Sequence, residues 1–220
     1  VLIKMIPDAE ARVAALESGS CDLAVGLTFD DFNRLTASTS WSGNAYPVTD
    51  LGLIFITNKD AAMKDKNIRL ALHHSINKQK LIDELLLGYG RPMESLQVPG
   101  YDAYDRSIGF GRPMDSFQVP LFDAYDPTIK TEFDPYRARS YLLKSGYSKS
   151  KPLELIIQTT KGYRPRDYEM VKMVTEMWRE VGIEAKIQIY TDTEHLRLRA
   201  KHELAPVAFF KWSNSTGDPS

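Results

Sequence analysis

The sequence predicts an α/β domain built around a mixed β-sheet with flanking helices. Strand-like and helix-like segments alternate through most of the 220 residues, an order typical of α/β and α+β proteins. Capping residues stand at the start of several helical segments. The composition, 43% hydrophobic and 26% charged, is that of a globular protein with enough apolar residues to form a core.

The chain opens with a strand–helix–strand pattern. Residues 1–6 are apolar and extended, and we expect a strand there. Asp8 is a suitable N-cap for a helix over residues 9–18, which Gly19 ends. Residues 21–27 form a short apolar run and predict a second, buried strand.

The next elements are a short helix, a strand and a long helix. Residues 28–35 begin with the spacing of a capping box and predict a helix. Residues 51–57 are almost entirely apolar, which is typical of a central strand. Apolar residues recur at helical spacing over residues 67–87, so we expect one long helix that Gly88 ends.

The last part of the chain alternates helix and strand. Helices are indicated by capping residues, by a proline at a first helical position and by terminating glycines, and strands by short apolar runs. The expected elements are helix 134–144, strand 153–159, helix 166–181, strand 183–190, helix 191–202 and strand 206–212.

Residues 88–130 differ from the rest of the chain because they contain a tandem repeat with an offset of 21 residues. The repeat begins with GYGRPM at 88–93, and again with GFGRPM at 109–114. Two copies are too few for a solenoid. The repeat is either a duplication tolerated in a surface loop or a segment that widens or lines a ligand cleft.

Charge and cysteine content exclude several kinds of function. There are 28 Lys and Arg and 29 Asp and Glu, and the net charge of −1 gives no general attraction to nucleic acid or anionic membranes. The single cysteine, Cys21, excludes an internal disulfide and a multi-thiolate metal site. The sequence has no signal peptide, and both ends look cut, so we expect a piece of a longer protein.

The sequence predicts no metal site, no cofactor and no enzymatic activity. His73 and His74 are adjacent, so on a helix they point about 100° apart. His195 and His202 are about two helical turns apart, which is also unsuitable for one ion. None of the common nucleophile, zinc or phosphate-loop motifs occurs, and Cys21 lies in an apolar run where a lone thiol is expected to be inert.

Short motifs follow one another in order along nearly the whole chain. They are NIRLAL at 67–72, SINK at 75–78, GYGRP at 88–92, FDP at 133–135, GY at 146–147, VGI at 181–183, Trp212 and Asp218-Pro219. This ordered set resembles the extracytoplasmic solute-binding proteins of the dipeptide/oligopeptide/nickel class of ABC importers, bacterial solute-binding protein family 5.

The resemblance implies one lobe of a periplasmic-binding-protein type II fold that binds its ligand between two lobes. Residues 1–220 would form a single lobe, the later one, as a fragment of a longer two-lobed protein. The implied partners are a small solute, the missing N-terminal lobe of the same protein and the transmembrane permease subunits of an ABC importer. The implied location is periplasmic or otherwise extracytoplasmic, and no nucleic-acid partner is implied.

The segment after the last strand contains three candidate ligand-binding residues, Trp212, Asn214 and Ser215. The ends of strands in open α/β sheets commonly face ligand, and the resemblance places this segment at the cleft between the lobes. The alternative is a buried Trp followed by an ordinary turn. Peptide-binding relatives often have Asp at the position of Ser215, where it pairs with the ligand's α-amino group. A neutral hydroxyl cannot supply that charge-assisted bond, so the ligand class stays open.

A basic loop follows the strand at 153–159 and contains Lys161, Tyr163, Arg164 and Arg166. Three cations at a helix N-terminus are electrostatically unfavourable, and an anionic group on the ligand would offset this. Arg can bind a carboxylate or phosphate through two parallel hydrogen bonds. The alternative is a solvated loop without a ligand.

Trp41 and Asn44 precede the strand at 51–57 and are the remaining candidates. Their segment mixes aromatic, small and polar residues, which suits the wall of a site for varied ligands. The alternative is a loop that covers the core.

The sequence therefore favours a solute-binding lobe of an ABC importer that captures short peptides or peptide-like solutes. Within this class, the alternative ligand is a non-peptide solute such as an opine or a sugar-phosphate conjugate. A different class is a peptide or ester hydrolase, with His195 or His202 near Ser213 or Ser215. A third is a scaffold whose repeat mediates protein contacts.

Overall fold

The computed structural model describes residues 1–46, 50–58, 60–90, 92, 132–162 and 166–213. These residues belong to two compact units, Val1–Val48 (unit 1) and Thr49–Ser220 (unit 2), and each is described by itself. The assignment of the whole chain to a single lobe stays a prediction. Most of the predicted repeat at 88–130 lies outside the described residues.

Unit 1 contains two helices that begin at the predicted caps. α1 (Ala9–Glu17) begins at Asp8, whose carboxylate accepts a backbone N–H of the first turn. α2 (Phe29–Thr36) begins at Thr28, whose hydroxyl oxygen does the same. Both predicted helices are confirmed. The core of this unit is small and consists of Val13, Leu16 and Leu35, with Ala24, Leu27 and Trp41 packed against it.

The two strands predicted in unit 1 are wrong, because residues 1–6 and 21–27 form no strand among the described residues. A strand needs a neighbour to satisfy its backbone N–H and C=O groups, and the described part of unit 1 supplies none. Cys21 is accordingly half-exposed and is not in a buried strand. Large apolar side chains on both segments are 73–91% exposed, namely Leu2, Ile3, Met5, Leu23 and Val25.

Unit 2 is built on a four-stranded mixed sheet with the order β1-β4-β2-β3. The strands are β1 (Asp50–Ile56), β2 (Leu153–Thr159), β3 (Ile183–Ile189) and β4 (Val207–Ser213). β2 is parallel to both β3 and β4, whereas β1 is antiparallel to β4. The predicted mixed sheet is confirmed, but β1 is an edge strand among the described strands and not a central one.

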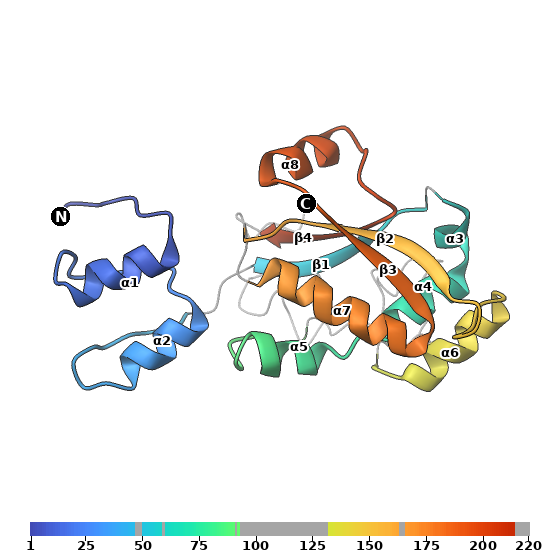
Figure 1. Ribbon diagram of the computed structural model, residues 1–220, viewed down its shortest axis with the longest axis horizontal. Coiled ribbons are helices and arrows are strands. Elements are labelled where there is room, and N and C mark those ends of the chain that lie inside the picture. Colours follow the sequence, from blue (N-terminus) through green and yellow to red (C-terminus); the bar gives the residue numbers. More distant parts are fainter. Residues whose placement is uncertain (47–49, 59, 91, 93–131, 163–165, 214–220) are drawn as a thin grey trace, which may run out of the picture. The chain divides into compact units, whose positions relative to one another are not determined.

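Helices cover the two faces of the sheet unequally. α7 (Asp167–Val181) packs on one face, called the inner face, and α8 (Asp192–Ala200) lies over the other, the outer face (Figure 1). α7 begins one residue later than predicted and ends at Gly182, whose φ of 106° is the left-handed conformation that favours glycine.

The core of unit 2 lies between the inner face and four shorter elements, α3 (Ala61–Lys64), α4 (Lys66–His74), α5 (Lys78–Leu85) and α6 (Pro135–Lys144). Trp178 of α7 is fully buried there, and its Nε1 donates to the Leu72 carbonyl oxygen at 3.1 Å. This bond joins α7 to α4. Other buried members of the core are Met63, Ile68, Leu142, Ile157, Val171 and Val207.

The long helix predicted over residues 67–87 is two helices, so that prediction is wrong. α4 ends at Ser75, and Asn77 caps α5 by accepting the N–H of Lys80 at 3.0 Å. Ser75 is buried and donates its hydroxyl back to the carbonyl of Leu72. Polar side chains that bond their own backbone favour helix ends, and here they override the continuous apolar spacing.

Candidate functional site

The carboxyl ends of β2, β3 and β4 meet at one edge of the sheet because these strands are parallel. We call this the carboxyl edge and define it by residues 159–162 after β2, 189–191 after β3 and 212–213 at the end of β4. The Tyr190 N–H donates to the Thr159 carbonyl oxygen at 2.9 Å, which fixes the first two of these ends together. Ligands of open α/β sheets commonly bind at such an edge.

β4 extends beyond β2 at the carboxyl edge. The two strands pair only at Ile157–Val207 and Gln158–Ala208, whereas β4 continues to Ser213 alongside β1. At about 3.3 Å per residue, β4 therefore runs past the level of Thr159 by roughly 13 Å. The carboxyl edge therefore has a step, because β2 ends earlier than β4 along the direction of the strands.

The loop after β2 is anchored by Asp167, a residue that the sequence reasoning missed. Asp167 is 1% exposed. Its Oδ2 accepts the Thr160 hydroxyl at 2.7 Å, and its Oδ1 accepts the N–H groups of Gly162 and Tyr168, both at 2.8 Å. The acidic residue in the first turn of a helix was a signal that could have found it, since a carboxylate there complements the helix dipole.

Of the predicted basic loop, the structure describes Lys161 and Arg166. Lys161 is exposed, and its Nζ lies 5.1 Å from the centre of the Tyr168 ring. Arg166 is half-buried in a left-handed conformation with φ of 60° at the start of α7. Tyr163 and Arg164 lie outside the described residues. Asp167 and Glu169 in the first turn offset part of the unfavourable charge that the sequence analysis assigned to this helix N-terminus.

The residues predicted after the last strand are only partly described. Trp212 belongs to β4, and its backbone is paired with Leu51 of β1, which places it on the carboxyl edge. Asn214 and Ser215 lie outside the described residues. Their part in a ligand site stays a prediction.

Trp41 and Asn44 belong to unit 1 and are described only within it. Trp41 is half-buried and packs against the small core of that unit, which is the alternative that the sequence analysis left open. Asn44 is exposed.

The histidines do not form a metal centre in the described part of the chain, where no group of three or more His, Cys, Asp or Glu side chains is placed to hold an ion. His74 is buried; its Nδ1 is 2.8 Å from the Glu132 carbonyl oxygen, and its ring stacks on Tyr141. His195 is buried and bonded to Gln158, whereas His202 is exposed. A hydrolase base must lie within hydrogen-bond reach of a nucleophile, and the described residues place none against the buried Nε2 of His195.

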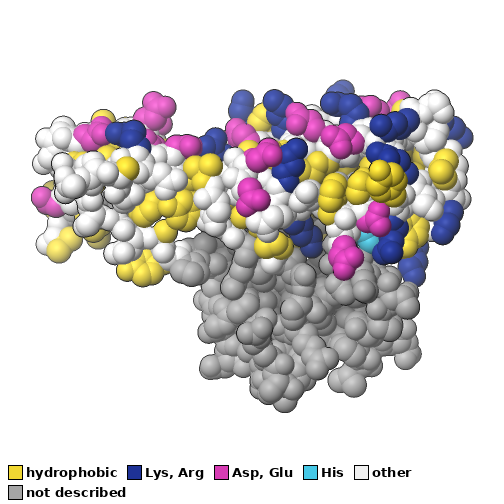
Figure 2. Space-filling view, turned by 90° about the horizontal axis from the view of Figure 1, so that it is seen from below, with side chains coloured by type: hydrophobic (Ala, Val, Ile, Leu, Met, Phe, Trp, Pro, Cys, Tyr) yellow, Lys and Arg dark blue, Asp and Glu magenta, His cyan; other side chains and the backbone are white. Residues whose placement is uncertain are grey.

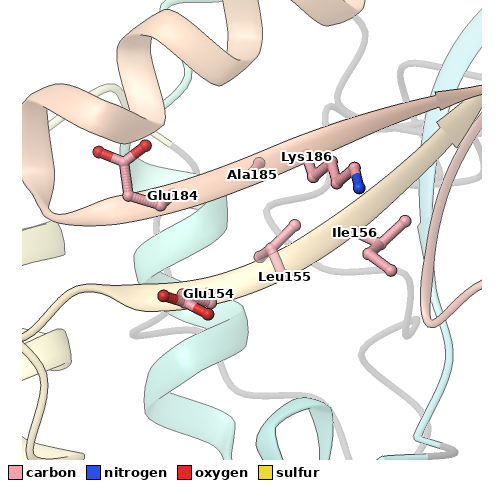
Figure 3. Close-up of a pocket in the computed structure, with 6 residues that line it drawn as sticks. All are labelled: Glu154, Leu155, Ile156, Glu184, Ala185 and Lys186. Atoms are coloured by element: carbon pink, nitrogen blue, oxygen red, sulfur yellow. The ribbon is translucent and has the colours of Figure 1, made fainter.

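A shallow hollow of about 400 Å³ lies at the other end of the sheet from the carboxyl edge (Figure 3). It is lined by Glu154, Leu155, Ile156, Glu184, Ala185 and Lys186 on the neighbouring strands β2 and β3. None of the predicted site residues is among them. An open hollow with a carboxylate on each strand lacks the enclosure that small-molecule sites share, so we favour the carboxyl edge.

The surface of the described residues carries charges of both signs. Figure 2 shows acidic and basic side chains interspersed on the face that it presents. Such mixing gives no extended field of one sign on that face for a nucleic acid to follow. No described helix has the length and apolar character needed to cross a membrane.

Comparison with known protein families supports the resemblance found in the sequence. The model for the bacterial extracellular solute-binding proteins, family 5 (middle region), matches residues 1–220, the whole chain. The chain belongs to this family.

Curated members of family 5 are similar to the chain over most of its length. It is 27% identical over 213 residues to di/tripeptide-binding protein 3 of Pseudomonas aeruginosa, covering 96% of the chain and 36% of that relative. It is 24% identical over 220 residues to the dipeptide-binding protein of Escherichia coli, covering 100% of the chain and 37% of the relative. By name these relatives are binding proteins, not enzymes.

Solved structures of family 5 proteins share the fold. NikA of Brucella suis, solved in complex with Fe(III)-EDTA, has a TM-score of 0.76 at 20% identity, covering 99% of the chain and 42% of that structure. AppA of Bacillus subtilis, solved with a nonapeptide, has a TM-score of 0.74 at 20% identity, covering 98% and 41%. The chain thus spans about two fifths or less of the length of these family 5 proteins.

Proposed function

We propose that this chain contributes one lobe of the solute-binding protein of an ABC importer, and that the complete protein captures short peptides or peptide-like solutes between two lobes. Membership of family 5 across residues 1–220 carries this proposal. The names of the relatives, which include dipeptide- and di/tripeptide-binding proteins, support peptides as the ligand class. The proposed location is outside the cytoplasmic membrane.

The proposed ligand surface is the carboxyl edge of unit 2. It brings the loop after β2, with Lys161 and Arg166, to the same side of the sheet as the end of β4. Asp167 anchors the start of the loop, because its buried carboxylate accepts two hydrogen bonds there, from the Thr160 hydroxyl and the Gly162 N–H. Cations next to a strand end suit the carboxylate that every free peptide carries at its C-terminus.

The proposed mechanism is closure of two lobes around the ligand. A solute that contacts both lobes stabilises the closed form by its differential affinity for that form. The closed form would then present both lobes to the permease subunits of the importer. One lobe encloses only part of the ligand, so we expect weak binding by this chain without the other lobe.

A non-peptide anionic solute, such as an opine or a sugar-phosphate conjugate, is the second candidate. Ser215 favours it, because a neutral hydroxyl stands where peptide-binding relatives often have a carboxylate for the α-amino group. The basic residues of the loop after β2 would serve such a ligand equally well.

The test is a titration of intrinsic tryptophan fluorescence in the complete two-lobed protein. The probes are a defined mixture of di- and tripeptides, an opine such as octopine and a sugar phosphate. We expect a saturable change with the peptides, and Trp212→Phe tests whether Trp212 reports it. The control is Trp41→Phe, since Trp41 packs in the core of unit 1.

A saturable response to octopine or to the sugar phosphate, with none to the peptides, would replace the peptide assignment by the second candidate. No response to any of the three probes by a folded protein would contradict both ligand classes.

A further inference from the structure

A buried polar pair lies beneath α8 on the outer face of the sheet. Gln158 of β2 is 1% exposed and His195 of α8 is 4% exposed. The Gln158 Nε2 and the His195 Nδ1 are 3.3 Å apart, and the Gln158 Oε1 accepts the Ala205 N–H at 3.0 Å. One amide therefore bonds both α8 and the connection from α8 to β4.

The hydrogen bonds determine which form of the imidazole fits. A backbone N–H can only donate, so the Gln158 oxygen must face Ala205 and its NH2 group must face His195. The His195 Nδ1 therefore accepts and carries no proton. The proton of the neutral ring is on Nε2, which is buried and has no hydrogen-bond partner among the described residues. The site thus fits a neutral imidazole only.

Among the described residues, the charged groups that shift the pKa of His195 are both on its own helix. Asp192 raises and Arg199 lowers the pKa of His195, but burial has the largest effect and lowers that pKa below its ordinary value. The side chains that meet it from the sheet, Gln158 of β2 and Phe210 of β4, are uncharged, and the Phe210 ring centre is 6.3 Å from that of His195. The Arg199 guanidinium lies over the same Phe210 ring at 4.9 Å.

The Gln158–His195 pair contacts β2, α8 and the connection between α8 and β4, which are the elements that hold the start of β4 in place. Gln158 is the penultimate residue of β2 and is the last to pair with β4, opposite Ala208. Ala205 lies two residues before β4 begins. If the Gln158 amide turned away, the Ala205 N–H would lose its acceptor on β2, only a few residues before the part of β4 that forms the carboxyl edge.

We propose that Gln158 and His195 are positioning residues for the carboxyl edge, and that they hold it only while the imidazole is neutral. This inference rests on the proposed function for its effect on ligand binding, but not for its effect on the order of β4. Protonation would place an N–H on Nδ1 against the NH2 group of Gln158. The amide cannot turn to accept it without losing the bond from Ala205.

The direction of the pH effect follows from linkage. The folded protein binds the His195 proton less tightly than the unfolded chain does, whose histidine has a pKa near 6.5. The stabilising contribution is complete above that value and is lost as the pH falls below it toward the lower pKa of the folded state. We therefore expect the entry to β4 to loosen, and ligand affinity to fall, between neutral pH and pH 5.

The experiment compares four forms of the complete protein at pH 7.5 and pH 5.0. They are the wild type, His195→Asn, His195→Phe and His202→Asn. Asn can accept from Gln158 but does not titrate, whereas Phe cannot accept. His202→Asn is the matched control, because His202 is exposed and has φ of 57°, a conformation that Asn adopts readily. The readouts are amide exchange of residues 201–210, corrected for intrinsic rates, and affinity for the di- and tripeptide mixture.

In the wild type and in His202→Asn we expect exchange about fivefold faster at pH 5.0, which corresponds to the loss of one buried hydrogen bond. His195→Asn should remove this pH dependence, and His195→Phe should show the fast exchange at both pH values. Peptide affinity should follow exchange in each form. If His195→Phe does not fold, the comparison of His195→Asn with the wild type decides alone.

The inference is overturned if His195→Asn keeps the pH dependence of the wild type, or if peptide affinity is the same in every folded form at both pH values. In the second case the proposed function stands. If no form binds peptide but exchange behaves as expected, the proposed function fails while the positioning of β4 by the pair is supported.

Discussion

Unit 1 and unit 2 have the same kind of strand–helix–strand sequence, yet in the described part of the chain a sheet forms in unit 2 alone. Residues 1–6 and 21–27 flank α1 as β2 and β3 flank α7, and all four segments are apolar. In unit 2 the two segments pair in parallel over seven residues each, and a third strand continues the sheet. In unit 1 the described residues provide no pairing strand. The difference teaches that an apolar run becomes a strand only where the fold supplies a neighbour.

Each unit also uses a charged side chain to fix the ends of its segments. In unit 2 the Asp167 carboxylate is buried and accepts from the loop after β2. In unit 1 Arg12 is half-buried and donates to the carbonyls of Ile6, Pro7 and Gly26 at 2.7–2.8 Å. Arg12 thereby joins the two segments on either side of α1, which form no strand pair among the described residues.

The largest effect is expected from a substitution on the inner face of the sheet, if burial on that face provides most of the stability of unit 2. Ile157 is fully buried on that face, whereas its neighbour Ile156 is 45% exposed on the outer face. We expect Ile157→Ala to lower the free energy of unfolding by about 2–5 kcal/mol and Ile156→Ala by less than about 1 kcal/mol. Urea unfolding followed by tryptophan fluorescence measures both. Equal losses would show that the two faces are equally packed.

The next effect concerns the anchor of unit 2. Asp167→Ala leaves the Thr160 hydroxyl and the Gly162 N–H without their acceptor, and we expect a loss of about 2–3 kcal/mol of unfolding free energy. The control is Glu169→Ala, which removes only a charge from the first turn of α7 and should cost less than about 1 kcal/mol. Urea midpoints of the two variants give the comparison. The anchor is unimportant if the two midpoints coincide.

A smaller effect is expected in unit 1 from replacing Arg12, which joins the segments on either side of α1. Arg12→Ala removes three bonds to carbonyl oxygens, and we expect local opening of residues 1–7 and 21–27 to become easier by about 1–2 kcal/mol. Limited proteolysis and amide exchange of these residues measure it. Arg34→Ala is the matched control, because Arg34 is exposed and pairs with exposed Glu17. Equal cleavage of both variants would contradict a role for Arg12.

The smallest effect is a pH-dependent bond between α4 and α6. The Ser145 hydroxyl donates to the Asp65 Oδ2 at 2.6 Å, and this bond is the main reason why the pKa of Asp65 is below its ordinary value of 3.8. Its contribution is present above pH 3.8 and is lost as the pH falls through the lower folded pKa. We expect Ser145→Ala to cost less than about 1 kcal/mol at pH 6, and nothing once Asp65 is protonated. Urea unfolding of both forms over this pH range tests the window; a difference that persists at the acid end would contradict it.

Local signals in the sequence predicted the helices well. Asp8, Thr28 and Thr191 cap helices where they were expected to, because a side-chain acceptor three residues before a backbone N–H is a short-range feature. The same kind of local bonding at Asn77 divides the predicted long helix, and the apolar spacing of residues 67–87 conceals that break. For the helices, local rules therefore failed where two of them disagreed.

Long-range features could not be predicted in the same way. The edge position of β1 depends on strand order, and the Gln158–His195 pair joins residues 37 positions apart. Lys161 and Arg166 lie beside the carboxyl edge, and Trp212 is placed there by its backbone, but their part in a ligand site stays a prediction. Asp167 was missed because the sequence analysis weighed the cations of the loop and not the carboxylate that anchors it.

The step at the carboxyl edge has a mechanical consequence. Beyond Ala208, β4 is hydrogen-bonded on one side only among the described residues, to β1. A two-stranded ribbon twists more and is less stable than the four-stranded sheet from which it projects. We therefore expect the end of β4 to be more flexible than the four-stranded part of the sheet. It could then adjust to solutes of different length while the core of unit 2 keeps its packing.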